Sequence, residues 1–152
     1  MTGPSGGTSI EIGPRSGARP TADRDSVRLK AWFPGTAEAV SQAREWVSEV
    51  AVSTGHAPLA PTVELLVSEL ATNAVRYADG KRFSVEFDAD GLLLIAVCDA
   101  VTTKPTPRHA LASEEGGRGL AIVDALSDRW GAEVHHDGKC VWFQLEDPAP
   151  SA

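Results

Sequence analysis

The sequence lacks any long run of apolar residues. Hydrophobic residues make up 42% of its 152 positions, yet no uninterrupted stretch approaches the ~20 residues that a membrane-spanning helix needs. The N-terminal residues are rich in Gly, Pro, Ser and Thr and do not contain the apolar centre of a secretory signal. We therefore expect a cytoplasmic protein that has no membrane partner.

Positive charge is also scarce. The chain has 14 Lys and Arg against 21 Asp and Glu, which gives a formal net charge of −7 at pH 7. The phosphates of nucleic acid call for a basic surface, so we expect no direct nucleic-acid partner. Any phosphate that the protein binds must be held by a few local groups rather than by overall charge.

The chain has only two cysteines, and they lack the spacing of metal ligands. Cys98 and Cys140 lie far apart in the sequence, and each is embedded in an apolar run. This pattern is typical of small core side chains in a reducing compartment, and it disfavours a zinc site. We expect both residues to be buried, reduced thiols.

Composition divides the chain into three parts. Residues 1–25 show neither helical nor strand periodicity and contain too few apolar residues to offset the entropy of ordering, so we expect a disordered leader. Residues 147–152 resemble it and are expected to form a disordered tail. One domain of residues 26–146 lies between them, and its length is ordinary for a single core.

Within this domain the hydrophobic pattern alternates between strand and helix periods. The sequence predicts strands at 26–33, 82–89, 91–99, 132–136 and 139–146, helices at 36–50, 61–78 and from about 120 to 130, and a long loop at 100–116. Asp137-Gly138 is a strong hairpin signal between the last two strands. The fold class expected is α+β, a two-layer sandwich with helices on one face of a mostly antiparallel sheet.

The helix expected at 61–78 carries an unusual polar pair. Glu69 and Asn73 are one turn apart, and helical geometry places both at the edge of the apolar stripe. One interpretation is a solvated pair, which is common on helices. The other is a site, because a carboxamide oxygen suits Mg²⁺ and a carboxylate can accept a proton from a hydroxyl group.

Two further features have the same ambiguity. Asp99 ends a buried strand, where it could initiate a turn or accept a hydrogen bond from an exocyclic amine such as that of adenine. Gly116, Gly117 and Gly119 precede a helix expected to begin near Leu120, whose free amides would attract an anion, although many glycine-rich turns bind nothing. Arg118 could add a cationic contact or be merely exposed.

The order of these motifs resembles that of a known family. The stretches "ELLVSELATNAVRYA", "VCDA" and "GGRGLAIVDALSDRWG", followed by "GKCVWFQL", are similar to the asparagine, aspartate and second glycine boxes of the GHKL ATPases, which include gyrase and histidine kinases. The similarity is greatest to the small bacterial anti-sigma-factor serine kinases, and it covers roughly residues 26–146.

This resemblance implies a Bergerat-type fold, a sheet backed by about three helices, with ATP and Mg²⁺ as cofactors. It implies that Asn73 binds the metal ion, that Glu69 is the catalytic base and that Asp99 reads the adenine amine. Four consecutive residues would approach the phosphates: Gly117, Arg118, Gly119 and Leu120.

The function that the resemblance implies is an ATP-dependent serine protein kinase that acts as an anti-sigma factor. Its partners would be a sigma factor and a small antagonist protein that receives the phosphate, and a homodimer is possible for this group. One departure motivates an alternative: the family usually has glycine two positions after the aspartate, where this chain has Val101. The alternative is a non-catalytic regulatory binding module of the same fold with weak or no nucleotide binding.

Overall fold

The computed structural model describes residues 8–10, 27–77, 80–90, 92–100, 114–135 and 138–146, and for 8–10, 90 and 114–119 it describes the backbone only. Expectations for the loop at 101–113 and for the tail at 147–152 lie outside the described residues. The departure at Val101 lies outside them too.

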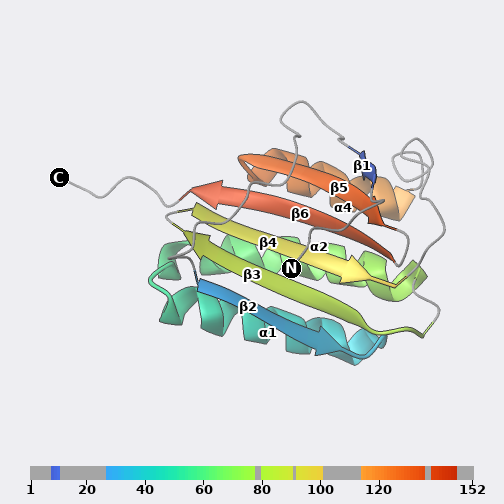
Figure 1. Ribbon diagram of the computed structural model, residues 1–152, viewed down its shortest axis with the longest axis horizontal. Coiled ribbons are helices and arrows are strands. Elements are labelled where there is room, and N and C mark those ends of the chain that lie inside the picture. Colours follow the sequence, from blue (N-terminus) through green and yellow to red (C-terminus); the bar gives the residue numbers. More distant parts are fainter. Residues whose placement is uncertain are drawn as a thin grey trace.

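The described strands form one six-stranded sheet in which every pairing is antiparallel (Figure 1). Their order across the sheet is β1-β5-β6-β4-β3-β2. The strands are β1 (Thr8–Ile10), β2 (Val27–Phe33), β3 (Phe83–Asp90), β4 (Leu92–Asp99), β5 (Arg129–His135) and β6 (Gly138–Glu146).

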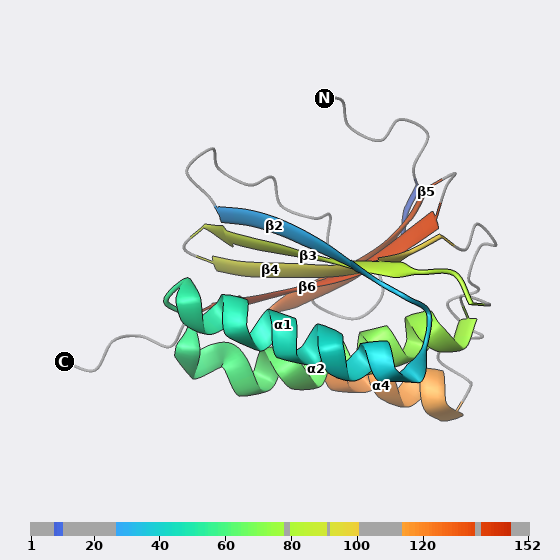
Figure 2. The same cartoon turned by 90° about the horizontal axis from the view of Figure 1, so that it is seen from below.

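Three α-helices in the described ranges cover one face of this sheet (Figure 2). They are α1 (Ala37–Ser53), α2 (Ala60–Tyr77) and α4 (Glu114–Leu126), and the short 3₁₀ helix η1 (Ala57–Leu59) leads into α2. The expected α+β sandwich of an antiparallel sheet and about three helices is confirmed. No helix in the described ranges is long and apolar enough to cross a membrane.

Helix α1 begins and ends at residues whose side chains bond to its backbone. Thr36 is the N-cap, and its Oγ1 accepts a hydrogen bond from the Ala39 amide at 3.3 Å. At the other end the Thr54 hydroxyl donates to the carbonyl of Val50 at 2.7 Å. The Thr36 contact satisfies an amide that a helix start leaves unpaired, whereas the Thr54 hydroxyl adds a second bond to a carbonyl that also accepts the Thr54 amide at 3.0 Å. The predicted cap is confirmed.

Helix α2 was expected at 61–78 and is observed at Ala60–Tyr77, so each end is one residue earlier than predicted. Its buried residues recur with helical spacing and pack against the sheet and the other helices: Ala60, Val63, Leu66, Val67, Leu70, Ala71 and Ala74. Pro61 falls in the first turn, where its missing amide costs no intrahelical bond.

Strand β4 lies near the middle of the sheet, and its side chains are buried on both faces. Leu93, Ile95 and Val97 face the helices, while Leu94 and Ala96 join a small apolar cluster with Trp142 on the opposite face. This explains why its sequence reads as a continuous apolar run rather than an alternating one. The buried central strand expected at 91–99 is confirmed.

Some expectations about the fold differ from the structure. Thr8–Ile10, within the expected leader, forms strand β1 against β5, so extended backbone occurs before residue 26. Trp130, expected near the end of the last helix, lies in β5, because α4 ends at Leu126. Trp142, expected between sheet and helices, packs on the sheet face that points away from the helices. Successive strand residues point to opposite faces, and its neighbour Phe143 faces the helices.

Candidate functional site

Glu69 and Asn73 lie side by side along α2, at the border of its buried face. Both side chains are partly buried, and each is flanked by fully buried neighbours, such as Leu70 and Ala74. Within the described part of the chain, neither side chain makes a hydrogen bond or ion pair. Their partial burial confirms the rim position expected from helical geometry.

Asp99 ends β4, and its carboxylate is held by a lysine from the neighbouring strand. Strand register places Asp99 opposite Lys139 of β6. The Lys139 ammonium donates to Asp99 Oδ2 at 2.8 Å, and the two side chains are only 17% and 4% exposed. Burial makes this pair costly to break, because each charge would lose an ion-pair partner at a site with little access to water. Sequence reasoning missed Lys139.

Gly138 lets β6 start close against the end of β4. A Cβ atom at this position would overlap the backbone carbonyl oxygen of Asp99. No other residue type fits without moving one of the two strands. The sequence predicted Gly138 only as part of a hairpin turn. Its close approach to Asp99 depends on β4, which is distant in the sequence.

The residues expected to bind nucleotide come from elements that meet at one end of the molecule. The C-terminal half of α2, the end of β4 and the start of α4 all lie at this end, as two perpendicular views show (Figures 1 and 2). Helix α2 packs against both β4 and α4. Asn73 and Asp99 thus belong to neighbouring elements of the helical and sheet layers.

The glycine-rich segment differs from its expected conformation. Helix α4 begins at Glu114 rather than near Leu120, so Gly117, Arg118, Gly119 and Leu120 all lie within it. Glycine lowers helix stability but does not prevent helical angles, and the two acidic residues at the start of α4 interact favourably with the positive end of the helix dipole. Free amides therefore belong to the turn that ends at Gly117. The Leu120 side chain packs into the core.

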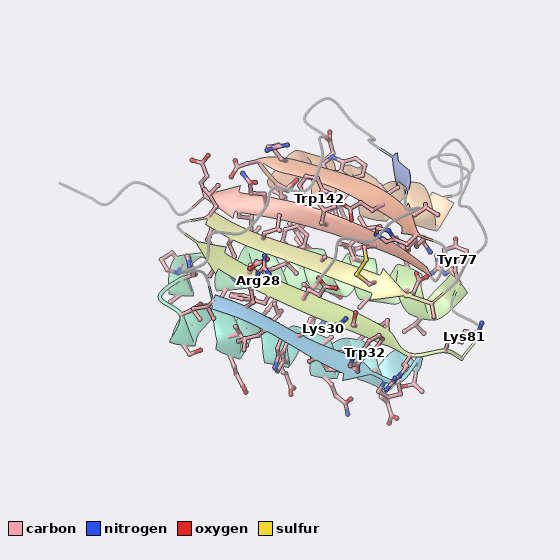
Figure 3. All side chains as sticks on the ribbon, viewed as in Figure 1. Arg28, Lys30, Trp32, Tyr77, Lys81 and Trp142 are labelled. Carbon is pink, nitrogen blue, oxygen red and sulfur yellow. A yellow bond between two sulfur atoms is a disulfide. The ribbon has the colours of Figure 1, made fainter. Side chains whose placement is uncertain are left out.

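The two cysteines are not the separate reduced thiols that we expected. Cys98 and Cys140 are directly opposite each other on β4 and β6, and they form a disulfide on the sheet face away from the helices (Figure 3). Period-two alternation places them on that face and strand pairing brings them together. The pairing of the two cysteines could not be predicted without the register of β4 and β6. For this reason the expectation of two reduced thiols was wrong.

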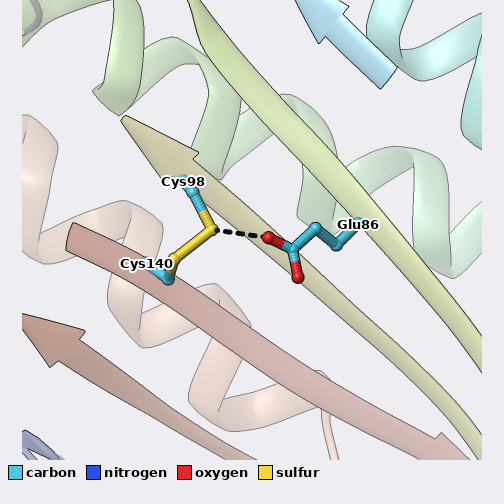
Figure 4. Close-up of side chains that lie close together, drawn as sticks. All are labelled: Glu86, Cys98 and Cys140. Carbon is cyan, nitrogen blue, oxygen red and sulfur yellow. Dashed lines mark hydrogen bonds between the residues drawn. A yellow bond between two sulfur atoms is a disulfide. The ribbon is translucent and has the colours of Figure 1, made fainter. Parts of the chain in front are cut away.

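Glu86 of β3 lies beside this disulfide. Its Oε2 atom is 3.5 Å from Cys98 Sγ (Figure 4), and the possible ligand atoms of Glu86, Cys98 and Cys140 lie within 4.8 Å of one another. Metals bind thiolates, and a disulfide supplies none, so the oxidised cluster does not offer a metal site.

An open hollow of about 270 Å³ lies on the same face of the sheet. Its lining includes the disulfide, Glu86, Asp99 and Lys139. Neither Glu69 nor Asn73 is among the residues that line it. The hollow therefore adjoins the Asp99–Lys139 pair from the side opposite to the helices.

The chemistry of the available donors fits a nucleotide with Mg²⁺. Mg²⁺ takes oxygen ligands and commonly binds one or two protein groups together with phosphates and water. Asn73 offers an amide oxygen and Glu69 a carboxylate one turn away on the same helix. A carboxylate has several acceptor positions, so the contact from Lys139 to Asp99 is compatible with a second donor such as an amine.

Comparison with known proteins supports the same class of fold. The crystal structure of the RsbU and RsbW domains of Rv1364c from Mycobacterium tuberculosis superposes with a TM-score of 0.63 at 18% sequence identity. The match covers 82% of this chain and 34% of that one, so this chain spans about a third of its length. No curated protein matches the sequence. The profile of the histidine kinase-like ATPase domain matches residues 33–145, and the chain belongs to this family.

Proposed function

We propose that this protein is an ATP-dependent serine protein kinase that acts as an anti-sigma factor. It would transfer the terminal phosphoryl group of ATP to a serine of a small antagonist protein, and it would sequester a sigma factor. Membership of the histidine kinase-like ATPase family supports nucleotide binding. The resemblance of the sequence motifs to the anti-sigma-factor serine kinases supports the choice of substrate and partners.

The observation that carries this proposal is the pair Glu69 and Asn73. Both side chains are partly buried at the border of the core, on one edge of the same helix. They project from the helix that packs against the strand bearing Asp99. The residues that we propose as metal ligand, base and adenine-binding group are thereby carried by adjacent elements.

Each residue would have a separate task in the transfer. Asp99 would accept a hydrogen bond from the exocyclic amine of adenine and so set the position of the base. Asn73 would hold Mg²⁺, which supplies charge stabilisation to the transferred phosphoryl group. Glu69 would orient the serine hydroxyl and accept its proton.

The segment at the start of α4 would serve the phosphates. Backbone amides in the turn that ends at Gly117 point out of the helix start, where the helix dipole favours negative charge. Gly119 and Leu120 continue the helix behind that turn, and Arg118 would add a positive charge.

The buried Asp99–Lys139 pair favours a second candidate function. A carboxylate that is 4% exposed and already bound to an ammonium group is less accessible to adenine. The same fold could then act as a non-catalytic regulatory module that binds its protein partner with little or no nucleotide. This alternative predicts sigma-factor binding that is independent of ATP.

The two functions separate in a transfer assay with ATP labelled on the terminal phosphate. The purified chain, Mg²⁺ and a candidate antagonist protein should yield a labelled serine on the antagonist, and Glu69→Gln should lose transfer while still binding ATP. Thr72→Ala, an exposed neighbour on the same helix, is the matched control and should retain transfer. Tight binding of a sigma factor without any labelling would favour the non-catalytic module.

A further inference from the structure

Cys98 lies one residue before the end of β4, and Cys140 lies two residues after the start of β6. Strand β4 ends at Asp99 and β6 begins at Gly138. The disulfide is therefore next to the Asp99–Lys139 pair along both strands. Its two Cα atoms are 4.0 Å apart. Strand ends open more readily than strand centres, and a covalent link at this position holds both ends together.

The disulfide is reachable from one side. Both sulfur-bearing residues line the hollow on the outer face of the sheet, where Cys98 is partly exposed and Cys140 is 7% exposed. A small thiol entering the hollow therefore meets Cys98 first. A disulfide enclosed in the main core between sheet and helices would not offer this approach.

Two buried polar atoms beside the disulfide have no partner in the described part of the chain. They are Ser84 Oγ and His135 Nδ1, and both residues line the same hollow. Ser84 lies opposite Cys98 in the strand register. Buried polar atoms normally form hydrogen bonds, so these atoms mark a place that suits a polar molecule. The amide and carboxylate groups of a small peptide thiol would supply the missing partners.

Glu86 distinguishes the two oxidation states of Cys98. In the disulfide the sulfur carries no proton, and the carboxylate oxygen at 3.5 Å is only a close neighbour. In the reduced state a thiol at the same position can donate a hydrogen bond to that oxygen. Reduction therefore leaves a satisfied thiol at Cys98, while Lys30 pairs with the same carboxylate at 3.8 Å.

From this geometry we propose that Cys98 and Cys140 form a reversible redox site that exchanges with small peptide thiols and their disulfides. In oxidation, the Cys98 thiolate attacks the small disulfide RSSR, forms a mixed disulfide and expels one thiolate RS⁻. The Cys140 thiolate then attacks the Cys98 sulfur and expels the second RS⁻. The two protons lost by the cysteines go to the two RSH molecules, and reduction is the reverse sequence.

The oxidised site would hold Asp99 in place for nucleotide. Closing the disulfide restricts the ends of β4 and β6, so less ordering remains to be done when adenine binds. Oxidised protein should therefore bind Mg²⁺-ATP more tightly than reduced protein. This effect on affinity rests on the proposed function, whereas the thiol exchange and the stiffening of the strand ends do not.

The test equilibrates the full chain with mixtures of reduced and oxidised glutathione, traps free thiols by alkylation and counts them by mass. We expect one reversible transition between the dithiol and the disulfide. Hydrogen exchange should be slower at the ends of β4 and β6 in the oxidised form and unchanged in α1. Cys98→Ser and Cys140→Ser, which cannot close the disulfide, should both exchange like reduced wild type in either buffer.

Nucleotide affinity is then measured on both forms. Mg²⁺-ATP should bind the oxidised wild type roughly fivefold or more tightly than the reduced one, a typical size for coupling between sites, and the serine variants should show no difference. A disulfide that never forms in the folded chain, or is reduced only after unfolding, would overturn the proposal. Equal hydrogen exchange in the two forms would also overturn it. If neither form binds ATP while thiol counts and exchange behave as expected, the redox site stands and the nucleotide proposal fails.

Discussion

Lys139 donates a hydrogen bond to Asp99 across two strands that are distant in the sequence, at 2.8 Å and with both side chains largely buried. The pair joins the residue expected to read adenine to the opening of β6. Gly138 and the disulfide lie on either side of Lys139 along that strand. Stability and ligand binding are therefore expected to depend on the same small region.

Replacing Lys139 tests the contribution of this buried pair. Lys139→Met should lower the free energy of unfolding by about 3 kcal/mol, because it removes the ammonium group that is ion-paired with a buried carboxylate. Arg28→Met removes an exposed ion pair with Asp88 and should cost less than about 1 kcal/mol. Urea denaturation gives both values, and equal losses in the two variants would contradict the importance of burial.

The close approach of the two strands can be tested at Gly138. Gly138→Ala should destabilise the fold, because the new methyl group would meet the carbonyl of Asp99. Gly80→Ala is the control: its φ of 80° strains a side chain, but nothing lies within 4 Å of the new Cβ atom. We expect a lower melting temperature for Gly138→Ala than for Gly80→Ala, and the reverse order would refute the steric account.

The cap of α1 allows a smaller, local prediction. Thr36→Ala removes the acceptor of the Ala39 amide and should cost about 1 kcal/mol, the usual value for a lost N-cap. Thr36→Asp retains an acceptor at the helix start and should be close to wild type. Thermal unfolding measured by circular dichroism compares the three proteins, and an unchanged midpoint for Thr36→Ala would argue against the cap.

Glu69 has a specific expected role in catalysis. Glu69→Gln keeps the size of the side chain and removes its ability to accept a proton, so phosphoryl transfer should fall roughly 10²–10⁴-fold. ATP binding should change little, because the adenine and metal groups are intact. Single-turnover transfer from bound, labelled ATP measures the step. Undiminished transfer would remove Glu69 from the mechanism.

Much of the helical layer was predictable from local patterns. The spacing of apolar residues located α2 within one residue at each end, and the same spacing placed Glu69 and Asn73 at the border of its buried face. A helix period determines which side chains share a face without reference to any other element. For this reason the polar pair could be identified before its surroundings were known.

Features that depend on pairing between distant strands were not predictable in this way. Lys139 meets Asp99, and Cys98 meets Cys140, only because β4 and β6 are neighbours in a particular register. The face chosen by Trp142 has the same origin, since a shift by one residue exchanges the two faces of a strand. The earlier start of α4 has a different cause, because glycine is compatible with both loop and helix.

The central claim is that Asn73 and Asp99 bind Mg²⁺-ATP, and isothermal titration of the purified chain tests it most directly. The account predicts saturable binding by wild type and by the control Thr72→Ala. It predicts affinity lower by roughly tenfold or more in Asn73→Ala and in Asp99→Asn, because each loses a ligand contact that involves a charge. No binding by the folded wild type, or unchanged affinity in both site variants, would contradict the account.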